Sequence, residues 1–187
     1  MNARDTRYLT LLAREYPSPQ AASAEIINLT AILNLPKGTE HFMSDIHGEH
    51  EAFLHILNNG SGAVADKIDQ AFECSLVIAE RRALSALIYY PREKLIEAKA
   101  TVTDLYDWYC VMLRRLIAVC RLSASKYSRS KVRKALPREF AYIMEELLNT
   151  APNRNQDRYY DNIIRAIIDT GSADTFIVEM ATLIKRM

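Results

Sequence analysis

Two groups of residues in this sequence could carry chemistry, and the first is a short motif near residue 45. Asp45 and His47 are two positions apart, and Gly48 follows them. Side chains two positions apart on a strand point in the same direction. A carboxylate and an imidazole held together in this way can ligate one divalent metal ion such as Mn²⁺, Fe or Zn²⁺. The motif therefore predicts metal ligands at the carboxyl end of a strand.

The residues around the motif predict a strand, a tight turn and a helix. Residues 39–45 are too few for a helix and predict a buried strand that includes Phe42. Gly48 allows a sharp turn, and residues 49–57 predict a helix whose first N–H groups could bind phosphate. The residues of this helix expected to face inward are Phe53, Leu54 and Leu57. Open α/β sheets bind ligands at the carboxyl ends of their strands, where this motif would lie.

The spacing of the motif also fits a structural role. His47 would then be a turn histidine and Asp45 an acid near a helix amino terminus. A D-x-H-G pattern arises by chance in roughly one or two chains in a hundred of this length. The remaining histidines, His41, His50 and His55, are expected to be solvated or packed rather than bound to metal.

The second group is a basic run between residues 121 and 138 that contains no acidic residue. Its seven cations are Arg121, Lys126, Arg129, Lys131, Arg133, Lys134 and Arg138. Such a run can bind a substrate or effector phosphate through charge-assisted hydrogen bonds, and the main candidates are Arg129, Lys131, Arg133 and Lys134. It can also be a solvated face that answers nearby acids such as Glu145. Nucleic-acid binding is disfavoured because Tyr127 is the only aromatic residue in the run.

The composition is that of an ordinary globular domain. The chain has 187 residues, a net charge of +1, 49% hydrophobic residues and 25% charged residues. This balance excludes disordered and collagen-like chains and gives no general attraction to nucleic acid or membranes. No apolar run reaches the ~18 residues that span a bilayer, and no signal-peptide pattern is present. Cys74, Cys110 and Cys120 lack C-x-x-C spacing and are expected to be core residues in a reducing compartment, so we expect a cytoplasmic protein.

Most of the chain predicts helices. Apolar residues recur at helical spacing in residues 6–16, and Ser18 with Pro19 predicts the start of the next helix. Thr101 and Asp104 resemble a capping box. The buried face of the helix behind this box is predicted to contain Leu105, Tyr109, Met112, Leu116 and Cys120. Further helices are predicted from Pro137, around residues 160–167 and around residues 176–184.

Residues 39–45 form the only convincing strand that the sequence predicts. A single strand cannot pair its own backbone, and each buried unpaired group costs about 1–3 kcal/mol. We therefore expect its partners to lie beyond Met187 or in another chain, and the chain to be the front part of a longer protein. In this chain alone, the segment is expected to form irregular coil, to pair with a second copy or to lower solubility.

Several stretches together resemble one enzyme family. The Asp45-Ile-His47-Gly48 motif resembles the first metal motif of the calcineurin-like metallophosphoesterases. The flanking sequences resemble class III fructose-1,6-bisphosphatases, the type found in Gram-positive bacteria and gut anaerobes. The stretches that carry this resemblance are residues 8–17, 24–29, 32–42, 44–49, 59–62, 89–91 and 127–137. His50 stands where a tyrosine is more usual in that family.

The resemblance implies hydrolysis of the 1-phosphate of fructose 1,6-bisphosphate to fructose 6-phosphate in gluconeogenesis. It implies a two-metal mechanism, with Mn²⁺ as the expected ion and Asp45 and His47 as ligands of one metal. Nucleotide or phosphoenolpyruvate effectors and a homo-oligomer are also implied. The family's later Gly-Asp-x-x-Asp-Arg and Gly-Asn-His-Glu motifs do not occur in this sequence. The catalytic residues are therefore expected downstream, and this chain alone is expected to be inactive.

The predicted fold is mostly α-helical, around one strand–turn–helix unit that would begin an α/β metallophosphoesterase sandwich. We divide the chain into an N-terminal helical segment (1–38), the first strand–turn–helix of the metallophosphoesterase core (39–60) and a further helical region (61–187). The alternative function is a non-catalytic helical fragment or interaction module with a vestigial metal motif.

Overall fold

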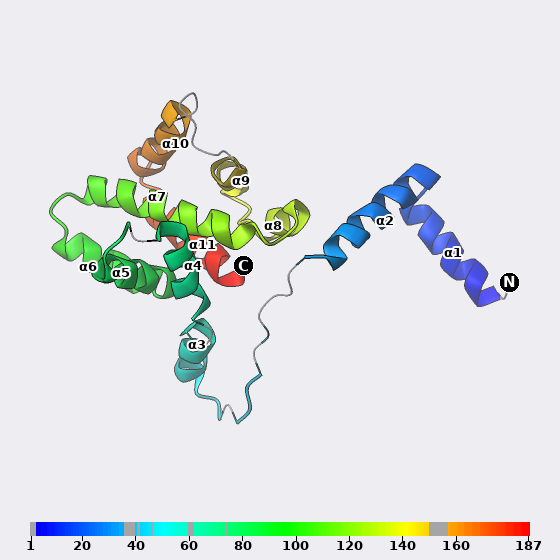
Figure 1. Cartoon of the computed structure of the whole chain (residues 1–187), viewed down its shortest axis with the longest axis horizontal. Coiled ribbons are helices and arrows are strands. Elements are labelled where there is room, and N and C mark those ends of the chain that lie inside the picture. Colours follow the sequence, from blue (N-terminus) through cyan, green and yellow to red (C-terminus); the bar gives the residue numbers. More distant parts are fainter. Residues whose placement is uncertain are drawn as a thin grey trace. The chain divides into compact units, whose positions relative to one another are not determined.

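The computed structural model describes residues 3–35, 40, 42–45, 47–59, 62–73, 75–149 and 157–187. The chain divides into two compact units, residues 1–37 and residues 38–187. Every regular element in the described ranges is a helix (Figure 1). The helices are α1 (Ala3–Glu15), α2 (Pro19–Leu33), α3 (His50–Asn59), α4 (Ala63–Phe72), α5 (Ile78–Tyr89), α6 (Pro91–Thr101), α7 (Leu105–Ala124), α8 (Arg129–Ala135), α9 (Ala141–Asn149), α10 (Asp157–Asp169) and α11 (Ala173–Arg186).

The first unit consists of α1 and α2, and its helix boundary follows from local capping. The Ser18 hydroxyl accepts a hydrogen bond from the backbone N–H of Ala21 at 3.1 Å, and Pro19 occupies the first turn. The predicted start of this helix is therefore confirmed. The apolar side chains of both helices are largely exposed, including Leu11, Ile27 and Leu33.

The core of the second unit is built around α7 and α11. The side chains of Leu113, Leu116 and Ile177 have no exposed surface. Helix α7 packs most extensively against α11 and also contacts α4, α5, α9 and α10. Of the predicted face of α7, Tyr109, Leu116 and Cys120 are buried, and Leu105 and Met112 are partly buried against the same core.

Two predicted helix starts are wrong by a few residues. Asp104 itself caps α7, because its carboxylate accepts a hydrogen bond from the Asp107 N–H at 2.9 Å. Thr101 instead ends α6, where its hydroxyl donates to the Glu97 carbonyl. The helix predicted from Pro137 begins at Ala141, since residues 138–140 form a turn first.

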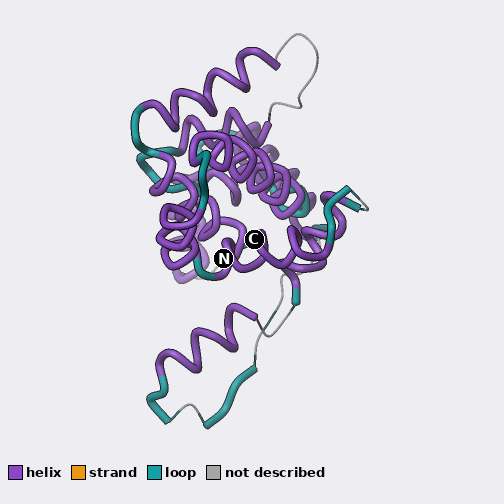
Figure 2. Tube along the Cα trace, turned by 90° about the vertical axis from the view of Figure 1, so that its left-hand side faces the viewer, coloured by secondary structure: helices purple, strands orange, loops and turns teal. Residues whose placement is uncertain are grey.

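The strand predicted at residues 39–45 does not form in the described part of this segment, which comprises residues 40 and 42–45. Figure 2 shows helices and loops, without a strand, throughout the described ranges. Phe42, which the strand was expected to bury, is 91% exposed. The predicted outcome of irregular coil is the one observed, because the described residues offer no second strand with which to pair. The described fold is all-helical, and an α/β sandwich is not present in it.

Helix α3 likewise does not bury the face predicted for it. Leu54 and Leu57 are 38% and 37% exposed, and Phe53 is only partly buried. In the described part of the chain, no helix combines the length and the apolar character needed to cross a membrane.

Candidate functional site

Asp45 and His47 lie side by side in the turn before α3. The Oδ1 atom of Asp45 is 2.7 Å from the Nε2 atom of His47. Both residues have left-handed backbone conformations, with φ of 63° for Asp45 and 51° for His47, and Gly48 follows with φ of 73°. Asp and His adopt this region more readily than most non-glycine residues. The turn, rather than strand alternation, therefore brings the two predicted ligands together.

The pair lies at a hollow of about 380 Å³ formed with the first turns of α3. The residues that line it are Met43, Ser44, Asp45, His47, Glu49, Ala52, Phe53 and Ile56. The side chains of Asp45 and His47 are 81% and 71% exposed. The Glu49 carbonyl accepts a hydrogen bond from the Phe53 N–H at 2.9 Å, which is the first helical hydrogen bond of α3. The site is therefore open to solvent, and α3 forms one side of it.

The donor chemistry of this pair fits one metal ion. Two adjacent ligands of an octahedral ion at ~2.1 Å lie about 3 Å apart, close to the observed oxygen–nitrogen separation. Among the described residues, no group of three or more His, Cys, Asp or Glu side chains is arranged to hold a metal. The pair therefore supplies two donors, and further ligands must come from elsewhere.

The other histidines are separate from this pair. His55 on α3 forms a hydrogen bond between its Nδ1 and the Tyr90 hydroxyl, and the two rings stack with centroids 6.2 Å apart. His50 begins α3 and is exposed. His41 lies outside the described residues. His55 thus has the packing role expected for it.

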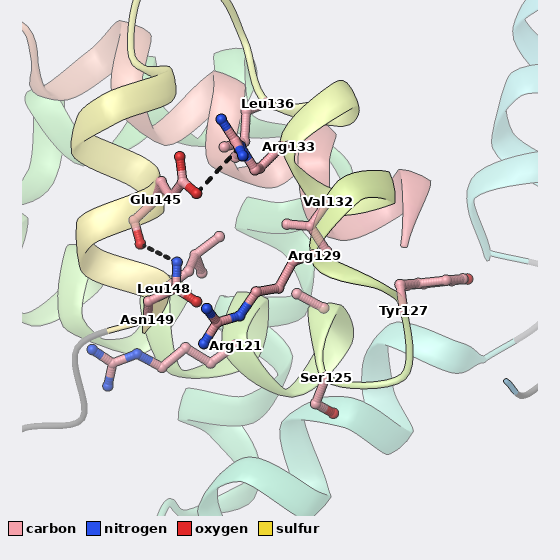
Figure 3. Close-up of a pocket in the computed structure, with 11 residues that line it drawn as sticks. Arg121, Ser125, Tyr127, Arg129, Val132, Arg133, Leu136, Glu145, Leu148 and Asn149 are labelled. Atoms are coloured by element: carbon pink, nitrogen blue, oxygen red, sulfur yellow. Dashed lines mark hydrogen bonds and ion pairs between the residues drawn. The ribbon is translucent and has the colours of Figure 1, made fainter. Parts of the chain in front are cut away.

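The middle of the basic run forms α8 (Arg129–Ala135), which the sequence did not predict as a separate helix, whereas Arg121 lies on α7. The Ser128 hydroxyl caps it by accepting a hydrogen bond from the Lys131 N–H at 3.3 Å. Arg129 and Arg133 line a hollow of about 280 Å³ between α7, α8 and α9 (Figure 3). Arg121 lines the same hollow, where its Nε donates to the Leu147 carbonyl at 2.8 Å.

The four residues predicted to bind phosphate do not all line the same hollow. The Nε of Arg133 is 3.4 Å from a carboxylate oxygen of Glu145, so this cation answers an acid of α9. Lys131 points to the other side of α8, with its Nζ 4.0 Å from the centre of the Tyr127 ring. Lys134 is exposed and does not line the hollow that contains Arg129 and Arg133. The candidates therefore do not form one site, and a phosphate-binding role for each remains a prediction.

A second hollow beside Lys131 is lined by further cations that no pattern in the sequence indicated. Lys67 on α4 and Lys185 and Arg186 on α11 line it together with Lys131. These residues are far apart in the sequence, and no local motif links them. Packing of α4 and α11 against the end of α7 brings them together.

Burial disfavours the thiolate form of the described cysteines, Cys110 and Cys120. Burial raises the pKa of the Cys120 thiol to about 12, and partial burial raises the pKa of Cys110. Both thiols are free, and Cys120 is fully buried in the core. This confirms the prediction of core cysteines for Cys120. Cys74 lies outside the described residues.

Comparison of the sequence with known proteins identifies the family of this chain. The chain belongs to the Firmicute fructose-1,6-bisphosphatase family, whose sequence model matches residues 7–187. It is 54% identical over 184 residues to "Fructose-1,6-bisphosphatase class 3 2" of Clostridium beijerinckii and 55% identical over 184 residues to "Fructose-1,6-bisphosphatase class 3" of Parabacteroides distasonis. Each match covers 98% of this chain but 28% of the relative. No solved structure matches the chain significantly.

Proposed function

We propose that this chain forms the amino-terminal part of a fructose-1,6-bisphosphatase. The complete enzyme would hydrolyse the 1-phosphate of fructose 1,6-bisphosphate to fructose 6-phosphate in gluconeogenesis. The observation that carries this proposal is the convergence of Asp45 and His47 within a chain that belongs to this family. Because the chain spans about 28% of the relatives' length, most of the proposed active site would lie in residues outside it.

In this proposal Asp45 and His47 are ligands of one of two divalent metal ions, with Mn²⁺ as the expected ion. Gly48 provides a permissive backbone turn, which holds the pair at the start of α3. When bound, a pair of divalent ions would neutralise charge on the phosphoryl oxygens and lower the pKa of bound water. The role of this chain is to hold the carboxylate and the imidazole at the separation expected for two adjacent ligands of one metal ion.

The proposed complete fold restores the strand. Residues 39–45 would join an α/β metallophosphoesterase sheet made with residues outside this chain, which would also bury Phe42. We propose residues 1–38 as an N-terminal helical segment, residues 39–60 as the start of the core and residues 61–187 as a helical region before the rest of the core. A cytoplasmic location, a homo-oligomeric state and nucleotide or phosphoenolpyruvate effectors are proposed by analogy with the family.

A chimaeric enzyme tests the proposed activity. This chain would replace the matching segment of the class 3 enzyme of Parabacteroides distasonis, and phosphate release from fructose 1,6-bisphosphate would be followed with Mn²⁺. We expect activity in the chimaera and a fall of about 10³-fold in kcat for Asp45→Asn or His47→Gln, since a lost metal ligand removes several kcal/mol of transition-state stabilisation.

Glu51→Gln is the matched control, because Glu51 lies on α3 close to the pair but does not line its hollow. This control should keep the activity of the unmodified chimaera. Full activity in the Asp45→Asn and His47→Gln chimaeras would contradict the proposed ligand role. It would favour the reading of a helical module with a vestigial motif.

A further inference from the structure

Helix α3 carries the Asp45–His47 turn but is not part of the buried core of the second unit. The turn and α3 enclose one hollow, whose walls include Glu49, Ala52 and Ile56. None of the described side chains of α3 belongs to the core cluster. The helix also packs less extensively against the rest of this unit than α4, α5, α7 and α11 do. The orientation of the turn therefore depends on the contacts that fix α3.

A hydrogen bond between His55 and Tyr90 links α3 to the core. The bond joins Nδ1 of His55 to the Tyr90 hydroxyl, and the two rings stack with centroids 6.2 Å apart and an angle of 20° between their planes. Tyr90 packs against the buried core, although His55 is itself exposed. The bond spans 35 positions of the sequence, from the middle of α3 to the junction of α5 and α6.

The backbone of Tyr90 is held on both sides of this junction. Its N–H donates to the Ala86 carbonyl at 2.8 Å and closes α5, and its carbonyl accepts a hydrogen bond from the Lys94 N–H at 3.1 Å and opens α6. Pro91 follows and restricts the backbone conformation of Tyr90. The Tyr90 phenol is therefore a fixed point against which α3 can be positioned.

A large hollow lies beside this bond, between α3, the α5–α6 junction and α11. Its volume is about 980 Å³, and Leu54 of α3 and Val178 of α11 are among the residues that line it. Ala52 and Ile56 line both this hollow and the hollow of the predicted ligand pair. Because the larger hollow leaves the apolar contact between α3 and the core incomplete, the directional bond of His55, rather than close packing, sets the orientation of α3.

We infer that His55 is a positioning residue for the Asp45–His47 pair. Its bond to Tyr90 holds α3 in one orientation on the core, and α3 in turn supports the turn that contains both donors. A ligand pair that is ordered before the metal ion arrives loses less conformational entropy on binding, so the bond raises the affinity for the ion. This inference rests on the proposed ligand role of Asp45 and His47.

Two variants remove the bond from opposite sides. Tyr90→Phe keeps the stacked ring and removes the hydroxyl, and His55→Leu removes the imidazole. In the chimaera with the Parabacteroides distasonis enzyme, we expect each variant to raise the Kd of Mn²⁺ in calorimetry by about 3–10-fold. This is less than the 10–100-fold typical of groups that contact a metal ligand directly, because His55 acts through α3. The Mn²⁺ concentration for half-maximal phosphate release should rise by the same factor, whereas kcat at saturating Mn²⁺ should change by less than about twofold.

A rescue variant and a control accompany them. His55→Asn should keep the Mn²⁺ affinity within about twofold, because its side-chain amide places a polar atom near the position of Nδ1. Tyr142→Phe should also leave the affinity unchanged, since Tyr142 lies on α9, is 71% exposed and lines neither hollow. Hydrogen exchange of this chain without metal gives a readout independent of turnover. The amides of α3 should exchange at least about fivefold faster in Tyr90→Phe and His55→Leu.

These measurements separate the positioning role from the proposed function. A lower Tm in Tyr90→Phe without a change in Mn²⁺ affinity would show a purely structural bond and overturn the inference. Unchanged exchange of the α3 amides would overturn it whatever the activity of the chimaera, and so would equal losses of affinity in His55→Asn and His55→Leu. If Asp45→Asn loses Mn²⁺ affinity while Tyr90→Phe retains it, only the positioning role is wrong. If Asp45→Asn binds Mn²⁺ as tightly as the unmodified chimaera, the ligand role is wrong and the inference fails with it.

Discussion

Removal of one hydroxyl group at the junction of α6, α7 and α11 should measurably destabilise the second unit. The Tyr109 hydroxyl donates to the Oδ1 atom of Asp174 at 2.5 Å, and Lys99 forms an ion pair with the same carboxylate. Tyr109 is 9% exposed, whereas the side chain of Asp174 is 37% exposed. The substitution Tyr109→Phe keeps the buried ring and removes only the hydrogen bond.

The expected loss follows from these exposures. A hydrogen bond to a charged group contributes about 1.5–3 kcal/mol, and partial solvation of the carboxylate reduces this to about 1–2 kcal/mol. For a unit of this size, such a loss lowers the Tm by about 2–8 °C. Urea unfolding followed by the fluorescence of Trp108 measures the loss in this unit, because Trp108 is the only tryptophan and lies on α7.

Tyr106→Phe is the control for this substitution. Tyr106 lies on the same helix and its hydroxyl also hydrogen-bonds a carboxylate, that of Asp169, but Tyr106 is 45% exposed, so solvent weakens this bond. Its loss should change the free energy of unfolding by less than about 0.5 kcal/mol. A double-mutant cycle of Tyr109→Phe with Asp174→Asn should give a coupling energy of about 1 kcal/mol. If Tyr109→Phe costs no more than the control, or if the coupling is zero, the hydrogen bond does not stabilise this junction.

Three further predictions concern pH, substrate turnover and the basic run. Partial burial opposes ionisation of Asp174, but hydrogen bonds from Lys99 and Tyr109 lower the pKa of its carboxyl below the ordinary 3.8. The stabilising contribution of Asp174 is therefore present above pH 3.8 and is lost as the pH falls through the lowered pKa. Urea unfolding at acid pH should show this loss of stability, and a smaller loss in Tyr109→Phe. This chain alone should release no phosphate from fructose 1,6-bisphosphate above background with Mn²⁺, and clear turnover in a phosphate-release assay would contradict the need for further ligands. In the chimaera, replacing Arg129, Arg133 and Lys134 together by Ala should weaken bisphosphate or nucleotide binding in calorimetry, as should added salt. Unchanged affinity in the triple variant would leave only a solvated basic face.

Local interactions explain what could be predicted from the sequence. The start of α2 depends on Ser18 and Pro19, whose capping effects reach only a few residues along the chain. The buried face of α7 could be predicted because its apolar residues recur at helical spacing, which is visible in the sequence itself. The proximity of Asp45 and His47 could be predicted because both residues lie within one turn.

Non-local contacts decided the features that the sequence could not predict. A strand needs a partner to pair its backbone, and the described residues provide none for residues 42–45. Arg133 pairs with Glu145 and Lys131 approaches the Tyr127 ring, because the helical geometry of α8 directs side chains two positions apart in different directions. The hollow beside Lys131 depends on packing of α4 and α11 against α7, which brings Lys67 and Lys185 together from opposite ends of the second unit's sequence. Sequence spacing carries no record of such proximity, because it arises only when the helices bury their apolar faces together.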